Sequence, residues 1–222
     1  MTAKLNFTRL DRVHGEYPNL DPEDDIVYFG EYAAKKKWNY SEFNSLVYNF
    51  KKGLEHKDSD HWYHKNAAIQ LVAGAMHKAV NQGSGALFVP IPTSKHRLDP
   101  LYDDRILRTL NSFNVFRGGV EDVREVIIQT AATRSSHSTS NRLTIDELLN
   151  VYTLDPDLIH GEPQSIVIFD DILTTGTHYA AARQVLKRQW PNAKFYGMFV
   201  GRTIWVDELP PVDLTDFLKN LE

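Results

Sequence analysis

Short apolar runs alternate with amphipathic segments through most of the chain. Four apolar runs are typical of buried strands: 86–90, 123–129, 166–169 and 195–200. Three helical segments are expected between them, at about 101–113, 145–152 and 177–190. Strands that alternate with helices predict right-handed crossovers and a mostly parallel sheet covered on both faces. The predicted fold class is therefore α/β.

The first third of the chain follows a different pattern. Residues 1–40 are polar and proline-broken, apart from an apolar segment at 26–32 that predicts a strand or an edge hairpin. Two helices are expected next, at about 41–55 and 60–82. In the second helix, apolar residues recur at helical spacing and form one stripe: Ala68, Leu71, Val72, Ala75, Met76, Ala79 and Val80. This stripe is predicted to belong to the core.

The most informative polar residues follow the apolar run 166–169. Asp170 and Asp171 cannot remain in the core, so they are expected in solvent at the carboxyl end of the strand, where open α/β sheets bind ligands. The turn 174–177, T-T-G-T, then leads into a helix and aims N–H groups and hydroxyls at an anion. Carboxylates beside a phosphate cradle fit a ribose 5-phosphate. A solvated acidic turn, with threonines capping the next helix, would explain the same residues without a ligand.

The ordered whole of strand, D-D, two apolar residues, T-T-G-T and helix resembles the signature of the type I phosphoribosyltransferases, which bind phosphoribosyl pyrophosphate (PRPP). Within that family the chain is most similar to the ComF-type phosphoribosyltransferases. Four segments carry this resemblance: V-P-I-P (89–92), R-S-S-H-S-T-S-N-R (134–142), D-D-I-L-T-T-G-T (170–177) and M-F-V-G-R-T (198–203). With a helical lead-in at 28–82, the resemblance covers most of residues 28–203.

The resemblance implies a single domain over residues 1–222, with 1–60 as a hood or lead-in, 61–203 as the PRPP-binding core and 204–222 as a C-terminal tail. It assigns the ribose 5-phosphate to six residues: Ile172, Leu173, Thr174, Thr175, Gly176 and Thr177. Asp170 and Asp171 would hold the ribose hydroxyls, directly or through water on Mg²⁺, and are the expected metal site. Together with Arg134 they are the catalytic candidates.

The loop after the first strand of the alternating series is expected to bind pyrophosphate. The resemblance assigns this role to Thr93, Ser94 and Lys95, whose ammonium supplies a point charge suited to phosphate. The alternative is that the prolines at 90 and 92 merely end a strand and that Lys95 is solvated. Segment 131–144 contains no acid and carries Arg134; it is expected to be a catalytic loop that folds over PRPP, or else a polar surface loop.

The chain also departs from the ComF-type pattern. It has no cysteine, hence no cysteine zinc ribbon and no disulfide. The arginine-glycine-asparagine-glutamine cluster usual after the first loop is replaced by L-Y-D-D-R (101–105), and His178 stands where a small or hydroxyl residue is more usual. These differences leave the expected fold intact but weaken the case for a role in competence for DNA uptake.

Composition limits the partners. Hydrophobic residues make up 42% and charged residues 24% of the chain, and its net charge is −4, so neither nucleic acid nor an anionic membrane is an expected partner. Without cysteine or an apolar signal core, a cytoplasmic protein is expected, with a homodimer as an option. Two functions remain open, since the acceptor is not identified: a Mg²⁺-dependent phosphoribosyltransferase that releases pyrophosphate, and a protein that senses PRPP without turnover.

Overall fold

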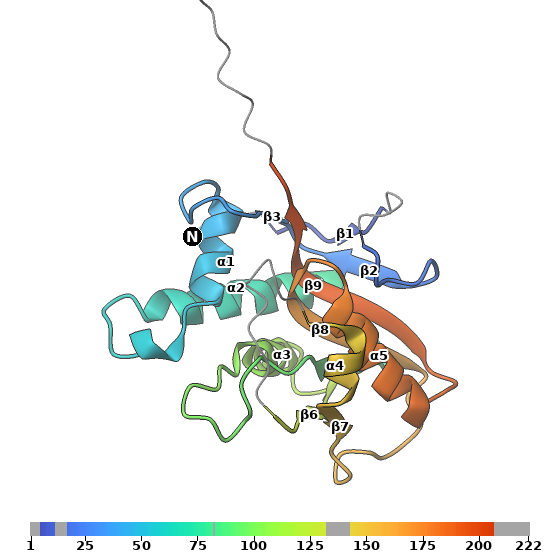
Figure 1. Cartoon of the computed structure of the whole chain (residues 1–222). Helices are drawn as coiled ribbons and strands as arrows, with labels where there is room; N and C mark the ends of the chain where they lie inside the picture. Colours follow the sequence, from blue (N-terminus) through green and yellow to red (C-terminus); the bar gives the residue numbers. More distant parts are fainter. Residues whose placement is uncertain (1–4, 12–16, 82, 132–142, 207–222) are drawn as a thin grey trace, which may run out of the picture.

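The computed structural model describes residues 5–11, 17–81, 83–131 and 143–206. Within them the main sheet has seven strands in the order β1-β2-β9-β8-β4-β5, with β3 also paired to β9 (Figure 1). The strands are β1 Thr8–Arg9, β2 Asp25–Tyr28, β3 Glu31–Ala33, β4 Leu87–Pro90, β5 Asp122–Val123, β8 Ser165–Leu173 and β9 Lys194–Ile204. Every pairing is parallel except that of β1 with β2. The predicted α/β class with a mostly parallel sheet is confirmed.

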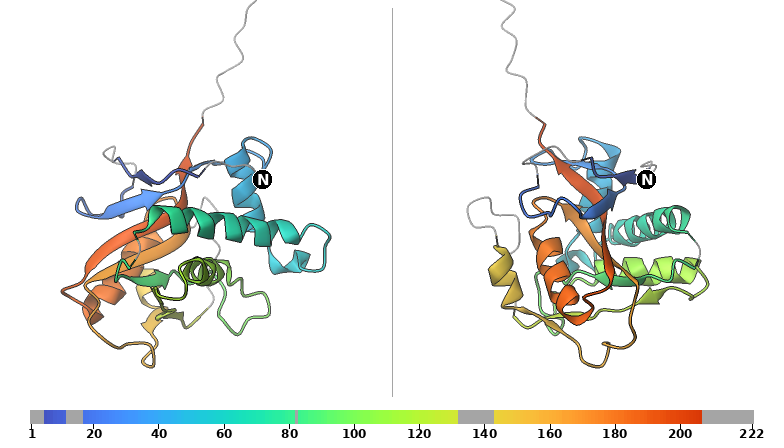
Figure 2. Two further views of the ribbon diagram at one scale, coloured as in Figure 1. Left: turned by 180° about the vertical axis from the view of Figure 1, so that it is seen from behind. Right: turned by 90° about the vertical axis from the view of Figure 1, so that its right-hand side faces the viewer.

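Helices cover both faces of this sheet, as the right-hand view of Figure 2 shows. One face carries α1 (Glu42–Phe50), α2 (Tyr63–Ala79) and α3 (Arg105–Phe116), and the other carries α4 (Ile145–Leu149) and α5 (Thr177–Gln189). Successive residues of β8 point to alternate faces, so Ile168 packs in the core beneath α5 whereas Phe169 packs in the core beneath α2 and α3. None of the helices in the described ranges is long and apolar enough to cross a membrane.

The strand order reverses between β4 and β8. The chain leaves β4 through α3 toward β5 at one edge, and it leaves β8 through α5 toward β9 on the opposite side. β4 and β8 are direct neighbours, with Phe88 opposite Val167 and Pro90 opposite Phe169. Open α/β sheets form their ligand crevice outside the carboxyl ends of the strands at such a reversal.

The apolar segment 26–32 does not form the edge hairpin that was one of its two predicted forms. It gives two strands, β2 and β3, that both run parallel to β9, with Val27 opposite Met198 and Tyr32 opposite Thr203. The backbone between them stays attached to β9, because Phe29 N donates to Val200 O at 3.3 Å and Arg202 N donates to Gly30 O at 2.9 Å. Strands from residues 1–60 are therefore part of the central sheet.

Several boundaries differ from the sequence prediction. The expected helix 41–55 is α1 followed by a short 3₁₀ helix, Leu54–His56, and the helix expected at 101–113 begins only at Arg105. The apolar stripe of α2 is confirmed as core, since Ala68, Val72 and Met76 are fully buried. The helix and the final strand expected at 177–190 and 195–200 are confirmed as α5 and the middle of β9.

The strand expected at 123–129 is instead two strands in two sheets. β5 joins the main sheet, whereas β6 (Ile127–Gln129) pairs antiparallel with β7 (Tyr152–Leu154), which occupies the end of the helix expected at 145–152. Polar side chains interrupt the run: Arg124 Nη1 donates to His160 O at 2.7 Å, and Tyr102 Oη donates to Glu125 Oε1 at 2.6 Å. The backbone N–H of Arg124 still donates to Phe88 O of β4 at 3.0 Å, and the chain leaves β4 after this residue.

Candidate functional site

A cavity of about 190 Å³ lies at the carboxyl ends of β4 and β8, where the strand order reverses. Six of the residues singled out in the sequence line it: Thr93, Ser94, Asp170, Asp171, Ile172 and Thr174. Five further polar or aromatic residues join them: Tyr32, Lys51, Arg105, His178 and Thr203. The fold thus gathers the acidic pair, the start of the T-T-G-T turn and the loop after β4 around one space.

Asp171 does not lie in solvent beyond the strand, and that prediction was wrong. β8 continues to Leu173, and Asp171 is a buried residue within the strand. Its Oδ2 atom lies 2.5 Å from Arg105 Nη2 and 3.3 Å from Lys51 Nζ. Burial favours the neutral acid, but the charges of Lys51 and Arg105 outweigh it and hold the pKa of Asp171 well below its usual range. The two cations therefore offset the free-energy cost of burying this charged carboxylate.

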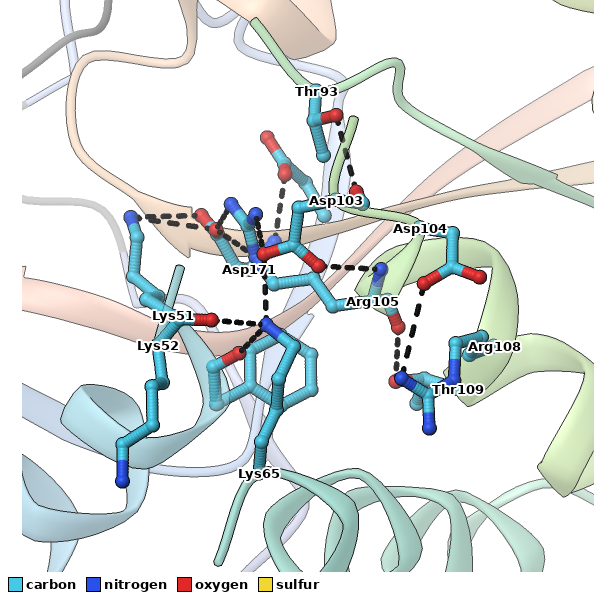
Figure 3. A network of polar contacts seen from close by, with 12 residues as sticks. Lys51, Lys52, Lys65, Thr93, Asp103, Asp104, Arg105, Arg108, Thr109 and Asp171 are labelled. Carbon is cyan, nitrogen blue, oxygen red and sulfur yellow. Dashed lines mark hydrogen bonds and ion pairs between the residues drawn. The ribbon is translucent and has the colours of Figure 1, made fainter. Parts of the chain in front are cut away.

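Arg105 connects Asp171 to a second buried ion pair (Figure 3). Arg105 Nη1 lies 2.9 Å from Asp103 Oδ2, and that oxygen lies 2.8 Å from Nζ of Lys65, a fully buried lysine of α2. Burial lowers the pKa of Lys65, whereas Asp103 opposes this shift. Lys65 Nζ also donates to the carbonyl oxygens of Phe50 at 3.1 Å and of Lys52 at 2.7 Å. This network ties the end of α1, helix α2 and the start of α3 to β8.

Asp170 faces the opposite side of the sheet from Asp171, because successive strand residues alternate. Its Oδ1 atom accepts the backbone N–H of Asp171 at 2.7 Å, and among the described residues no cation pairs with its carboxylate. Burial and the negative charge of Asp171 raise the pKa of Asp170 to about 7. On this side Tyr152 Oη and His178 Nδ1 share a hydrogen bond of 2.9 Å, and burial lowers the pKa of His178.

The T-T-G-T turn is held in place by its own hydroxyls and by the N-terminal segment. Gly176 has φ 81°, a left-handed conformation that favours glycine, and α5 begins directly after it. The hydroxyls of Thr175 and Thr177 share a hydrogen bond of 2.8 Å, and Asn19 Nδ2 donates to Thr177 Oγ1 at 2.9 Å. Leu20 packs so closely over Gly176 that a Cβ there would lie 2.5 Å from its Cδ2 atom. The turn is therefore a rigid start to the helix.

The predicted residues of this turn differ in their access to the cavity. Thr174 is exposed and lines the cavity, together with Ile172. Leu173 is a core residue with 1% exposure, so its side chain is not available to a ligand. The N-terminus of the 13-residue helix α5 nevertheless directs its first backbone N–H groups toward this end of the sheet.

The loop after β4 brings two of its three predicted residues to the cavity. Thr93 Oγ1 donates to Asp103 O at 3.1 Å, and Ser94 O accepts from Gln129 Nε2 at 3.1 Å, which fixes the loop at the cavity wall. Lys95 does not line this cavity; its ammonium lies 3.8 Å from Asp99. The other predicted cation, Arg134, lies outside the described residues.

The site offers limited direct ligation for a metal ion. Among the residues that the structure describes, no group of three histidine, cysteine or acidic side chains could hold a metal. Asp171 is engaged by Lys51 and Arg105, which leaves Asp170 as the carboxylate free of cation pairs within the described ranges. One such carboxylate suits Mg²⁺, which retains waters and takes further oxygens from a phosphate ligand.

Sequence reasoning missed the two cations of the site. Lys51 and Arg105 belong to segments far from the D-D motif, and nothing in local spacing connects them to it. A signal was present, however, because Arg105 and His178 both lie at positions where the chain departs from the ComF-type pattern. Both of these residues line the cavity.

No model of a known protein family matches this chain, and no curated protein matches it either. The chemistry of the site is therefore the main guide to its function.

Proposed function

We propose that this protein is a phosphoribosyltransferase: with Mg²⁺ it binds PRPP, transfers the phosphoribosyl group to a nitrogen acceptor and releases pyrophosphate. The observation that carries the proposal is the common cavity at the strand reversal, which joins the D-D pair, Thr174 of the T-T-G-T turn and Thr93–Ser94 of the loop after β4. A ribose 5-phosphate linked to pyrophosphate needs groups of these three kinds within one site.

The 5-phosphate would be bound by backbone N–H groups at the start of α5, together with the hydroxyl of Thr174. Binding of the 5-phosphate to this rigid turn would provide binding energy remote from the reacting carbon, and this energy can position that carbon for attack. Leu173, which the sequence resemblance assigned to this role, would contribute through its backbone alone because its side chain is in the core.

Phosphoribosyl transfer breaks the bond from the anomeric carbon to pyrophosphate before the new bond is complete, so positive charge develops on the ribose and negative charge on the leaving group. Asp170 would stabilise the cationic ribose. Arg105 and Lys51 would offset the charge on pyrophosphate, the role that the sequence had given to Lys95 and Arg134. Bound Mg²⁺ would neutralise pyrophosphate oxygens further, and Asp170 is the residue that would hold it.

A second candidate is a protein that binds PRPP without turnover. Arg105 and Lys51 are both paired with Asp171, and this pairing leaves less positive charge for a departing pyrophosphate than unpaired cations would provide. The two candidates differ in whether charge development on the leaving group is stabilised.

One pair of measurements separates these candidates. Calorimetry should show PRPP binding that requires Mg²⁺, because Asp170 and a pyrophosphate repel each other without a cation between them. An assay of pyrophosphate release with PRPP, Mg²⁺ and a panel of nucleobases and aromatic acids should then detect turnover. Binding without release from any acceptor would favour the sensor, and absence of binding would contradict both.

A further inference from the structure

A second, larger hollow lies directly beside the site. It has a volume of about 450 Å³, and its walls come from the segment after β3 and from the end of α1. Tyr32 and Lys51 line both this groove and the candidate site, so the two spaces are adjacent. Its volume falls in the range of about 300–1,000 Å³ that is usual for small-molecule pockets.

The groove is strongly basic in a protein of net charge −4. Four lysines line it, Lys36, Lys37, Lys51 and Lys52, and no carboxylate is among its lining residues within the described chain. Lys51 forms an ion pair with Asp171 at 3.3 Å, and Lys52 Nζ donates to His61 O at 3.1 Å. A neutral ligand would gain nothing from this concentration of positive charge, whereas an anionic ligand would be both attracted and held.

The same groove carries exposed aromatic rings. Trp38 is 56% and Tyr48 is 53% exposed, and their ring centroids lie 6.4 Å apart at an interplanar angle of 36°. Lys52 Nζ lies 5.8 Å from the centroid of the Tyr48 ring. Exposed aromatic rings in a hollow provide flat surfaces on which a planar ligand can stack.

We propose that the acceptor is a planar aromatic compound bearing a carboxylate or phosphate, bound in the groove against Trp38, Tyr48 and the lysines with its ring nitrogen toward the candidate site. This inference rests on the proposed function and names the class of its second substrate. The acceptor's ring nitrogen would donate its lone pair to the anomeric carbon as the carbon–oxygen bond breaks. The bonding pair would leave with pyrophosphate, and any proton on that nitrogen would pass to water.

The first test uses two probes with the same ring. Nicotinate and nicotinamide differ in one carboxylate, and titration calorimetry on the full chain should show that nicotinate binds at least about tenfold more tightly at low salt, with the difference shrinking as salt is added. The affinity for phenyl phosphate, measured in the same assay, shows whether the groove binds a phosphate more tightly than a carboxylate. Equal affinities for acid and amide, no measurable binding of either anion, or tighter binding of single-stranded oligothymidylate would each overturn the proposal.

The second test locates the binding. The double variant Lys36→Gln/Lys37→Gln should abolish the preference for nicotinate, whereas Lys78→Gln/Lys187→Gln, which removes the same charge at exposed positions outside the groove, should leave it unchanged. Equal loss of preference in both double variants would mean that the attraction is not to the groove.

These outcomes can be distinguished from failure of the proposed function. PRPP binding with Mg²⁺ tests the candidate site and uses no acceptor, whereas the comparison of nicotinate with nicotinamide tests the groove and uses no PRPP. If PRPP binds but acid and amide bind alike, only the acceptor class is wrong. If PRPP does not bind, the proposed function fails even where the groove selects the acid.

Discussion

The two faces of the sheet at the end of β8 treat neighbouring carboxylates in opposite ways. Asp171 faces α1, α2 and α3, where Lys51 and Arg105 hold its charge in a buried network (Figure 3). Asp170 faces the α5 side, near the hydrogen-bonded Tyr152 and His178, with no cation paired to it in the described structure. Because successive strand residues point to opposite faces, Asp171 stabilises the fold whereas its neighbour Asp170 is available to a ligand.

The two environments also explain the opposite pKa shifts of the two acids. Burial raises the pKa of both, and paired cations reverse the shift for Asp171 alone. An unpaired buried carboxylate destabilises the fold when it is ionised, and a bound cation would relieve that cost. Strongly shifted pKa values of this kind are common where a protein binds a metal or a substrate.

The largest expected effect is on stability. Asp171→Ala should lower the free energy of unfolding by about 3 kcal/mol, because it leaves Arg105 and Lys51 without their shared anion. Asp170→Ala should cost far less, and urea unfolding of the two variants side by side measures the difference. Equal losses would mean that the two faces do not differ in the way described.

The next effect is on ligand binding. Among variants that fold, we expect replacement of Asp170 to weaken binding more than replacement of Asp171. Asp170→Asn should weaken Mg²⁺-dependent PRPP binding about a hundredfold, since it removes the carboxylate that we assign to the cation. The variant should be no less stable than the wild type at neutral pH. Calorimetry gives the affinity and thermal unfolding the stability; a stable Asp170→Asn protein with unchanged affinity would remove Asp170 from the site.

The raised pKa of Asp170 predicts a pH dependence. Its folded pKa of about 7 lies above its usual value near 4, so the ionised carboxylate destabilises the fold, and this cost grows as the pH rises toward 7. Binding of Mg²⁺ with PRPP requires the ionised form, so affinity should increase from pH 6 to pH 8 by about tenfold and binding below pH 7 should release a proton. Calorimetry in buffers of different ionisation enthalpy detects that proton, and Asp170→Asn should not release it.

The smallest effect concerns the hydrogen bond on the Asp170 side. Tyr152→Phe removes the 2.9 Å contact with His178 and should lower stability by about 1 kcal/mol. Because this bond fixes a side chain of the cavity wall, PRPP affinity should fall only two- to threefold, on the order of 0.5 kcal/mol. A loss as large as that of Asp170→Asn would instead give Tyr152 a direct role in binding.

Local pattern was sufficient for much of the fold. The central apolar runs, the stripe of α2 and the start of α5 follow from periodicity that neighbouring residues determine by themselves. The departures from prediction lie where one segment depends on another. Within the 123–129 run, Arg124 contacts His160 and Glu125 contacts Tyr102 between two separate strands, and the segment 26–32 forms strands along β9 and not the hairpin alternative.

The sequence by itself determined that two acids, a hydroxyl-rich turn and a proline-containing loop meet at the carboxyl edge of a parallel sheet, because strand direction and motif order require it. Only the tertiary structure decided which acid is paired with cations, since Lys51 lies 120 residues and Arg105 66 residues from Asp171 along the chain. It likewise decided that Lys95 turns to Asp99 and that a basic aromatic groove adjoins the site. Ion pairs between residues so far apart in the sequence depend on how the helices pack, and a local sequence pattern does not predict that packing.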